Sequence, residues 1–122
     1  DGIADVAVAG GHSGKGSLIV STAAGEFGEA TIYTTDPGNA STDIGDLDGD
    51  GDLDWVLSSF SGADSDWSFF ENLGNGEFRR FLEFDSPKDA SCCLLVDFDR
   101  DGDLDAALID EADDVLIMLE NR

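Results

Sequence analysis

Basic residues are scarce in this chain. It has 6 Lys and Arg residues against 28 Asp and Glu residues, for a formal net charge of −22. Nucleic acids and anionic membrane surfaces are bound by basic patches, so we expect no nucleic-acid partner. No apolar run approaches the roughly 18 residues of a membrane span, so we also expect no membrane insertion.

Cysteine is almost absent, and a spaced disulfide framework is therefore excluded. The two cysteines, Cys92 and Cys93, are adjacent. One interpretation is a strained disulfide between these neighbours. The simpler interpretation is two small hydrophobic side chains on one strand that point to opposite faces of a sheet.

The chain has a single histidine, His12, in the glycine-rich loop 10–16. One histidine in such a loop does not support a Ser/His/Asp arrangement. Paired carboxylates could support glycosidase-type chemistry, but ten of the 28 acids belong to the repeated motif described below. We therefore expect a protein that is not an enzyme.

The 122 residues have the length of one domain, and a hydrophobic content of 41% can supply a core. The sequence shows neither an initiator methionine nor a secretion signal. We expect that it is an excised or processed piece of a longer protein.

Aspartate is abundant and is concentrated in two matching nonamers, 46–54 and 97–105, each with five aspartates. Neighbouring carboxylates repel by roughly 4 kcal/mol per pair at an effective dielectric constant near 20. A hard divalent cation reverses that term, and Ca²⁺ accepts six to eight oxygen ligands in a flexible shell. The expected ligand residues are Asp46, Asp48, Asp50, Asp52 and Asp54 in the first loop, and Asp97, Asp99, Asp101, Asp103 and Asp105 in the second.

The spacing assigns a role to each position. Positions 1, 3, 5 and 9 offer side-chain carboxylates, whereas position 7 would bind through its backbone carbonyl. Gly51 and Gly102 stand at position 6, where a sharp turn needs a positive φ. Position 12 is Leu57 or Leu108 instead of the glutamate of an EF-hand. We expect two Ca²⁺ sites and an incomplete third, with weak or no binding, at Asp1, Ile3 and Asp5.

The repeat extends beyond the nonamers, because 25–27 matches 76–78 at the same offset of about fifty residues. The central repeat contains four short apolar runs, at 43–46, 53–60, 67–72 and 78–84, with a hairpin turn at 72–76. Four strands in about fifty residues are typical of a propeller blade. We predict an all-β partial β-propeller of four-stranded antiparallel blades. Its predicted parts are 1–45 (strands 2–4), 46–96 (a complete blade) and 97–122 (strands 1–3).

The two nonamers, together with the segment 72–78 (Asn-Leu-Gly-Asn-Gly-Glu-Phe), resemble the FG-GAP/VCBS repeat family of integrin α-like β-propellers. The resemblance implies a calcium loop between the first and second strands of each blade, where it acts as a structural staple. It also implies an extracellular location, secreted or at the cell surface. Closed propellers have four to eight blades, so the rest of a propeller or other chains would cover the open blade edges.

Strand order places the connections 10–16, 36–41, 61–66 and 85–89 on the face opposite the calcium loops. These connections vary between the repeats, and binding residues favour such loops. The candidate residues for a ligand face are His12, Asp64, Asp66 and Trp67. Three functions fit: a calcium-binding adhesion or ligand-binding scaffold, a carbohydrate-binding propeller or non-catalytic module of a polysaccharide-degrading enzyme, and a purely structural segment of an extracellular assembly. The ligand would be a protein or a glycan.

Overall fold

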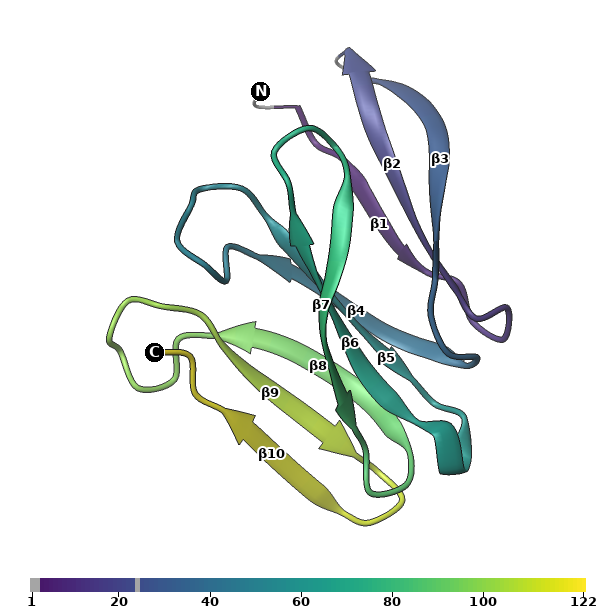
Figure 1. Cartoon of the computed structure of the whole chain (residues 1–122), viewed down its shortest axis with the longest axis vertical. Helices are drawn as coiled ribbons and strands as arrows, with labels where there is room; N and C mark the ends of the chain where they lie inside the picture. Colours follow the sequence, from purple (N-terminus) through teal and green to yellow (C-terminus); the bar gives the residue numbers. More distant parts are fainter. Residues whose placement is uncertain (1–2, 24) are drawn as a thin grey trace.

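The computed structural model describes residues 3–23 and 25–122, which form three antiparallel sheets (Figure 1). The first sheet has the order β1–β2–β3, with β1 at Val6–Ala9, β2 at Lys15–Ala23 and β3 at Glu26–Thr34. The chain is thus all-β, as predicted. Within the described residues, the only helical turn is the 3₁₀ turn η1 at Gly62–Asp64.

The second sheet has four strands in sequence order: β4 at Asn39–Gly45, β5 at Asp54–Ser59, β6 at Asp66–Asn72 and β7 at Phe78–Asp85. These strands fall on the four predicted apolar runs. The predicted hairpin turn between β6 and β7 is closed by a hydrogen bond from the Leu73 N–H to the Glu77 carbonyl, at 2.9 Å. Gly74 and Gly76 take positive φ in this turn.

The third sheet has the order β10–β9–β8, with β8 at Ala90–Val96, β9 at Asp105–Asp110 and β10 at Val115–Leu119. Cys92 and Cys93 both lie on β8 as free thiols, Cys93 buried and Cys92 partly exposed. Burial raises the pKa of the Cys93 thiol to about 12.

The sheets do not begin at the predicted divisions between residues 45 and 46 and between residues 96 and 97. β4 and β8 precede the Asp-rich loops in the chain, yet they pair with β5 and β9, which follow these loops. Each sheet therefore begins one strand before its loop. The motif marks the loop, whereas the hydrogen bonds across the loop define the sheet.

Two apolar clusters lie between the sheets. Between the second and third sheets, Trp67 and Phe69 pack with Leu108 and Cys93. Between the first and second sheets, Trp55 and its neighbours on β5 and β6 pack with Tyr33 of β3. Gly16 permits this packing, since a Cβ there would lie 2.4 Å from the Trp55 ring.

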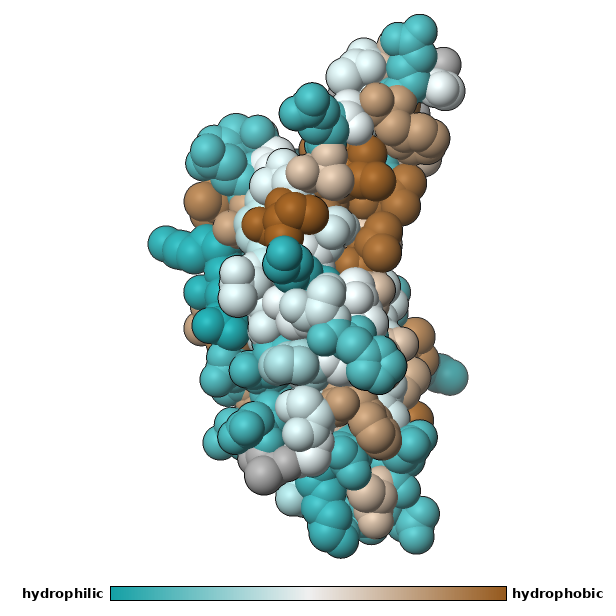
Figure 2. Space-filling model, turned by 90° about the vertical axis from the view of Figure 1, so that its right-hand side faces the viewer, coloured by the Kyte–Doolittle hydropathy of each residue, from teal (hydrophilic) through white to brown (hydrophobic). Residues whose placement is uncertain are grey.

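Large apolar side chains are also exposed on the outer strands. Phe27 and Ile32 of β3 are 60% and 52% exposed, and Leu116 of β10 is 61% exposed. Figure 2 shows apolar side chains gathered on the upper part of the molecule, where the first sheet lies. Among the described residues, no helix is long and apolar enough to cross a membrane.

Candidate metal centres

The two Asp-rich nonamers form loops between the first and second strands of their sheets. The first loop joins β4 to β5, and the second joins β8 to β9. In Figure 1 both loops project from the left side of the molecule, whereas η1 and the β9–β10 turn lie at the lower right. Loop position and strand order therefore place both loops at the same end of their sheets.

Three carboxylates converge in each loop. Asp46, Asp48 and Asp50 each offer an oxygen within 4.8 Å of the other two, and the second loop repeats this arrangement. The residues of the second group are Asp97, Asp99 and Asp101. The structure thus brings together positions 1, 3 and 5 of both loops.

Backbone N–H groups hold these carboxylates in place. The N–H of Asp50 donates to Asp48 at 3.1 Å, and the N–H of Asp52 donates to Asp50 at 2.8 Å. The equivalent bonds in the second loop measure 3.1 and 3.0 Å. The same sequence spacing therefore produces the same hydrogen-bonded loop twice.

Positive φ angles shape both turns. Gly51 and Gly102 at position 6 have φ of 95° and 108°, as predicted. Position 4 is also left-handed, with Gly49 at 77° and Arg100 at 68°. The sequence pattern did not indicate this second constraint, because only one of the two loops has a glycine there.

The pKa of the carboxylate at position 3, Asp48 or Asp99, is raised in both loops. The N–H of Asp50 lowers the pKa of Asp48, but desolvation and the negative charges of the other loop aspartates outweigh this bond, and the pKa is raised. Desolvation is the largest cause of the raised pKa of Asp99, and the negative charge of Asp101 adds to it. A cation at either position would offset this repulsion.

Asp54 and Asp105 at position 9 lie apart from these triads. Both are buried, with 2% and 1% of their surface exposed. Asp54 accepts the N–H of Leu47 on one oxygen and that of Asn72 on the other, each at 2.8 Å. The carboxylate at position 9 thus closes its loop and anchors it to the neighbouring strand. The exposed carboxylates of Asp52 and Asp103 are also outside the triads.

Of the incomplete third loop, Asp1 lies outside the described residues. The Asp5 carboxylate accepts the backbone N–H of Ser21 at 2.7 Å. Asp5 therefore makes the same kind of contact as Asp54, and Ile3 lies two residues before it.

Loops rich in oxygen atoms are suited to binding a Ca²⁺ ion. The three convergent carboxylates are hard oxygen donors, and two ligands on opposite sides of one Ca²⁺ ion are about 4.6–5.2 Å apart. The three carboxylate oxygens of each triad lie within 4.8 Å of one another, close enough for one ion to contact all three. The residues present could thus hold a metal ion, and their oxygen atoms are of the kind that Ca²⁺ accepts.

The residues expected on the opposite face do not form one surface. Trp67 is fully buried, its indole N–H donates to the Cys92 carbonyl at 2.9 Å, and its ring packs near Phe84. Trp67 therefore offers no exposed ring on which a sugar could stack and does not belong to a ligand face, because β6 turns this side chain into the core. His12 is exposed in the β1–β2 connection and does not line the hollow that Asp64 and Asp66 line.

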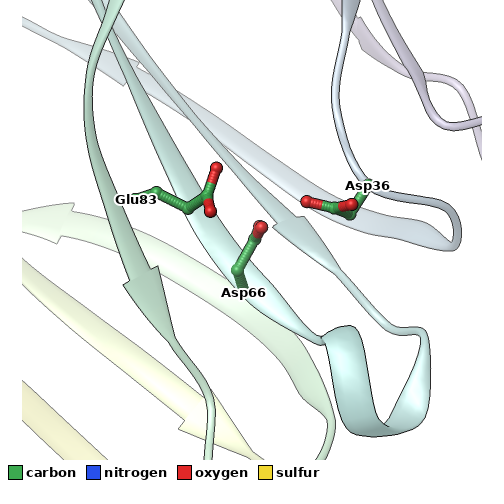
Figure 3. Close-up of side chains that lie close together, drawn as sticks. All are labelled: Asp36, Asp66 and Glu83. Atoms are coloured by element: carbon green, nitrogen blue, oxygen red, sulfur yellow. The ribbon is translucent and has the colours of Figure 1, made fainter.

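A third acidic group lies at that hollow, where Asp36, Asp66 and Glu83 point toward one another (Figure 3). Burial is the largest cause that raises the pKa of Asp66, to about 7, and a hydrogen bond with Asp36 and its negative charge add to the shift. Sequence reasoning missed Asp36 and Glu83. They stand 30 and 17 residues from Asp66 and belong to no shared motif.

A family model described as an FG-GAP-like repeat matches residues 1–57, which include the first Asp-rich loop. No curated protein and no solved structure matches the chain. FG-GAP-like repeats are generally non-catalytic, and they usually pair with other repeats or domains. Residues 1–57 of this chain are therefore similar to an FG-GAP-like repeat, a kind of repeat that suggests a β-propeller-type module.

Proposed function

We propose that this chain is a calcium-binding part of a β-propeller, which serves as a non-enzymatic scaffold for adhesion or ligand binding in a secreted or cell-surface protein. The convergence of three carboxylates in each of two loops of the same geometry carries this proposal. Bound Ca²⁺ would supply electrostatic attraction for the loop oxygens. The chain itself supplies the preformed turn, the N–H groups that orient the carboxylates, and the buried anchor at position 9.

The packing of the sheets supports a propeller. β4 packs beside both β1 and β8, so that the first strands of the three described sheets lie next to one another. The three sheets follow one another along the chain. Within each sheet the strands lie side by side in sequence order, as in the blades of a propeller. On this proposal, the three strands of the first sheet correspond to the second, third and fourth strands of the central sheet, and the three strands of the third sheet correspond to its first three.

The exposed edges indicate where partners would bind. The outer edge of β10 has no paired strand within the described residues, and Leu116 and Met118 on this strand are exposed. Unpaired edges of this kind are normally covered in native proteins. We propose that the rest of a propeller, or another chain, supplies the missing fourth strand.

We also propose an extracellular location, which is compatible with the proposed calcium chemistry. Extracellular calcium modules typically have dissociation constants of about 10⁻⁴–10⁻³ M, and the highly acidic surface is compatible with such surroundings. The carbohydrate-binding alternative loses its main support, because Trp67 is buried. The alternative of a purely structural segment shares the same metal loops and differs only in having no ligand.

Calorimetric titration with Ca²⁺ after chelation tests the loops. We expect the Asp50→Asn and Asp101→Asn variants each to bind one ion fewer than the unmodified chain. A tenfold excess of Ca²⁺ over its dissociation constant should stabilise the fold by roughly 1.4 kcal/mol per site. Equal stoichiometry in the variants and the unmodified chain, or an unchanged melting temperature on addition of Ca²⁺, would show that the loops are acidic turns without a metal.

A further inference from the structure

A large cavity lies between the second and third sheets, beside the Asp-rich loops. It has a volume of about 570 Å³, and pockets that bind ligands usually measure about 300–1,000 Å³. Both sheets and both loops contribute its apolar walls, which are formed by Leu47, Phe69, Phe81, Leu104, Ala106 and Leu119. The cavity therefore reaches β10, the strand whose outer edge is unpaired in the described part of the chain.

The repeat allows the second and third sheets to be aligned residue by residue at this end. Asp54 accepts the N–H of Asn72 at 2.8 Å, and Asp105 accepts the N–H of Asn121 at 2.9 Å. These aspartates are the first residues of β5 and β9. The same contact thus fixes the same positions in both sheets, and the residues that adjoin it are structural equivalents.

Smaller side chains in the third sheet leave the space for the cavity. Directly after its anchor aspartate, the second sheet has Trp55 paired with Phe70, and the two rings lie 5.4 Å apart. The third sheet has Ala106 paired with Leu119 at these positions, and both line the cavity. An indole and a benzyl ring are thus replaced by a methyl and an isobutyl group, which cannot fill the same volume.

A third aromatic residue completes the packing between the first and second sheets. It is Phe78, the first residue of the fourth strand β7, and its ring centroid lies 6.1 Å from that of Trp55 and 6.0 Å from that of Tyr33. The third sheet has no fourth strand in the described chain, and β10 is its outer strand (Figure 1). The cavity therefore lies where an aromatic residue from a fourth strand would pack against Ala106.

Charge indicates which residue would follow the aromatic one. In the second sheet, Phe78 is followed by Arg79, whose guanidinium lies 2.5 Å from the carboxylate of Glu71 on β6. Glu120 has the equivalent position in the third sheet and lines the cavity. Its carboxylate already accepts a guanidinium, that of Arg122, at 2.9 Å. A basic side chain at the start of an added strand would therefore meet an opposite charge.

We propose that this cavity receives an aromatic side chain from an extended partner strand that pairs with the outer edge of β10. The residue that follows the aromatic one is basic and faces Glu120. In this mode of recognition, backbone hydrogen bonds along the strand edge supply affinity and the pocket supplies specificity. The site rests on the proposed function, since the partner would be the missing fourth strand of the third sheet, but it does not require Ca²⁺ in the loops.

A second copy of this chain is not the partner that these contacts favour. Its own strand of this kind, β7, is already paired with β6. Each copy would also have a formal net charge of −22, and like charges oppose association. The partner is therefore a separate strand with an aromatic and a basic residue at its start.

The test is fluorescence anisotropy of a labelled peptide with the sequence of residues 74–85, which contain β7. We expect one peptide to bind to each full chain, in chelator as well as in Ca²⁺. Phe78→Ala in the peptide should weaken binding roughly tenfold or more, because the buried ring is lost. In the chain, Ala106→Trp should fill the cavity and weaken binding by a similar factor. The control Leu94→Trp, at an exposed residue of β8 outside the cavity lining, should leave binding unchanged.

A charge exchange tests the site without a change in its apolar walls. Glu120→Arg in the chain should weaken binding roughly two- to fivefold, and Arg79→Glu in the peptide should restore it. This measurement decides the outcome if Ala106→Trp does not fold by circular dichroism. Absence of binding would overturn the proposal. Equal affinity of the unmodified chain and a folded Ala106→Trp variant would also overturn it, since the peptide would then bind elsewhere.

Two further results separate this site from its alternatives. A dimer of the unmodified chain in sedimentation velocity that Ala106→Trp abolishes would identify a second copy as the partner and overturn the separate strand. Failure of the peptide to bind while the loops bind Ca²⁺ would overturn this site alone. Peptide binding without Ca²⁺ binding in the loops would support this site and overturn only the loop sites.

Discussion

The side chain of Asp54 holds the backbone of Asn72, and the side chain of Asn72 holds the backbone next to Asp54. Oδ1 of Asp54 accepts the N–H of Asn72 at 2.8 Å, and the amide of Asn72 donates to the carbonyl of Leu53 at 3.1 Å. This clamp joins the end of an Asp-rich loop to the end of the third strand of its sheet. Asp105 and Asn121 repeat it, with distances of 2.9 and 3.3 Å.

The clamp should stabilise the fold without a metal. Asp54→Ala leaves two backbone N–H groups without their acceptor, and we expect it to lower the free energy of unfolding by about 2–4 kcal/mol. Asn72→Ala removes one bond and should cost about 0.5–1.5 kcal/mol. Urea denaturation in the presence of a chelator measures both. The exposed control Asp52→Ala should stay within about 0.5 kcal/mol, and a loss at Asp54 seen only with Ca²⁺ would contradict the clamp.

Arg100 should carry backbone strain that its counterpart Gly49 avoids. Both take left-handed φ angles, which cost a residue with a side chain roughly 1–2 kcal/mol. We expect Arg100→Gly to stabilise the chain by roughly 0.5–1 kcal/mol, after the greater freedom of glycine in the unfolded chain is subtracted. Thermal unfolding in chelator checks this.

The matched control for Arg100 is Gly49→Arg. A Cβ at Gly49 meets no atom within 4 Å, so a loss of stability there reports backbone conformation and not a clash. If Arg100→Gly destabilises the chain, the left-handed turn is not the dominant constraint at position 4.

Asp110 should make the stability of the fold depend on pH. Burial alone would raise its pKa, but the Ser86 hydroxyl and the N–H groups of Lys88, Asp113 and Asp89 lower it well below its ordinary value. A lowered pKa in the folded state gives a stabilisation that is complete above the unfolded pKa of about 3.9 and is lost as the pH falls below it. We expect Asp110→Asn to cost about 2–3 kcal/mol at pH 7, and the difference from the unmodified chain to shrink toward pH 2.

Urea unfolding at several pH values, in chelator, measures this difference for Asp110. The control is Asp113→Asn, which removes an exposed ion pair with Lys88. Exposed pairs contribute about 0–1 kcal/mol, so this control should vary little with pH. A gap for Asp110→Asn that stays constant from pH 7 to pH 2 would be inconsistent with the lowered pKa.

Trp67 should act in the core and not in ligand binding. Trp67→Ala removes a buried ring and should cost about 3–5 kcal/mol, whereas Ala in place of the exposed Phe27 should change stability by about 0.5 kcal/mol or less. Trp67→Phe, which keeps an aromatic ring, should bind as many Ca²⁺ ions as the unmodified chain. Denaturation and calorimetry measure these effects, and a fully stable Trp67→Ala variant would contradict the burial.

Much of the fold could be predicted from local sequence. The apolar runs 53–60 and 67–72 became β5 and β6, and the segment Val115–Leu119 is a strand although its leucines and methionine also favour a helix. Strands and tight turns are read from neighbouring residues, and a repeat presents the same signal more than once.

The sequence alone determined the all-β class, the two Asp-rich loops, the positive φ of Gly51 and Gly102, and the FG-GAP-like resemblance, because each depends on residues close together in the chain. Tertiary structure alone decided that Asp54 is a buried anchor, that Trp67 faces the core, and that Asp36 and Glu83 meet Asp66. These features depend on which strands pair and which faces pack, and such contacts join residues that no local pattern relates.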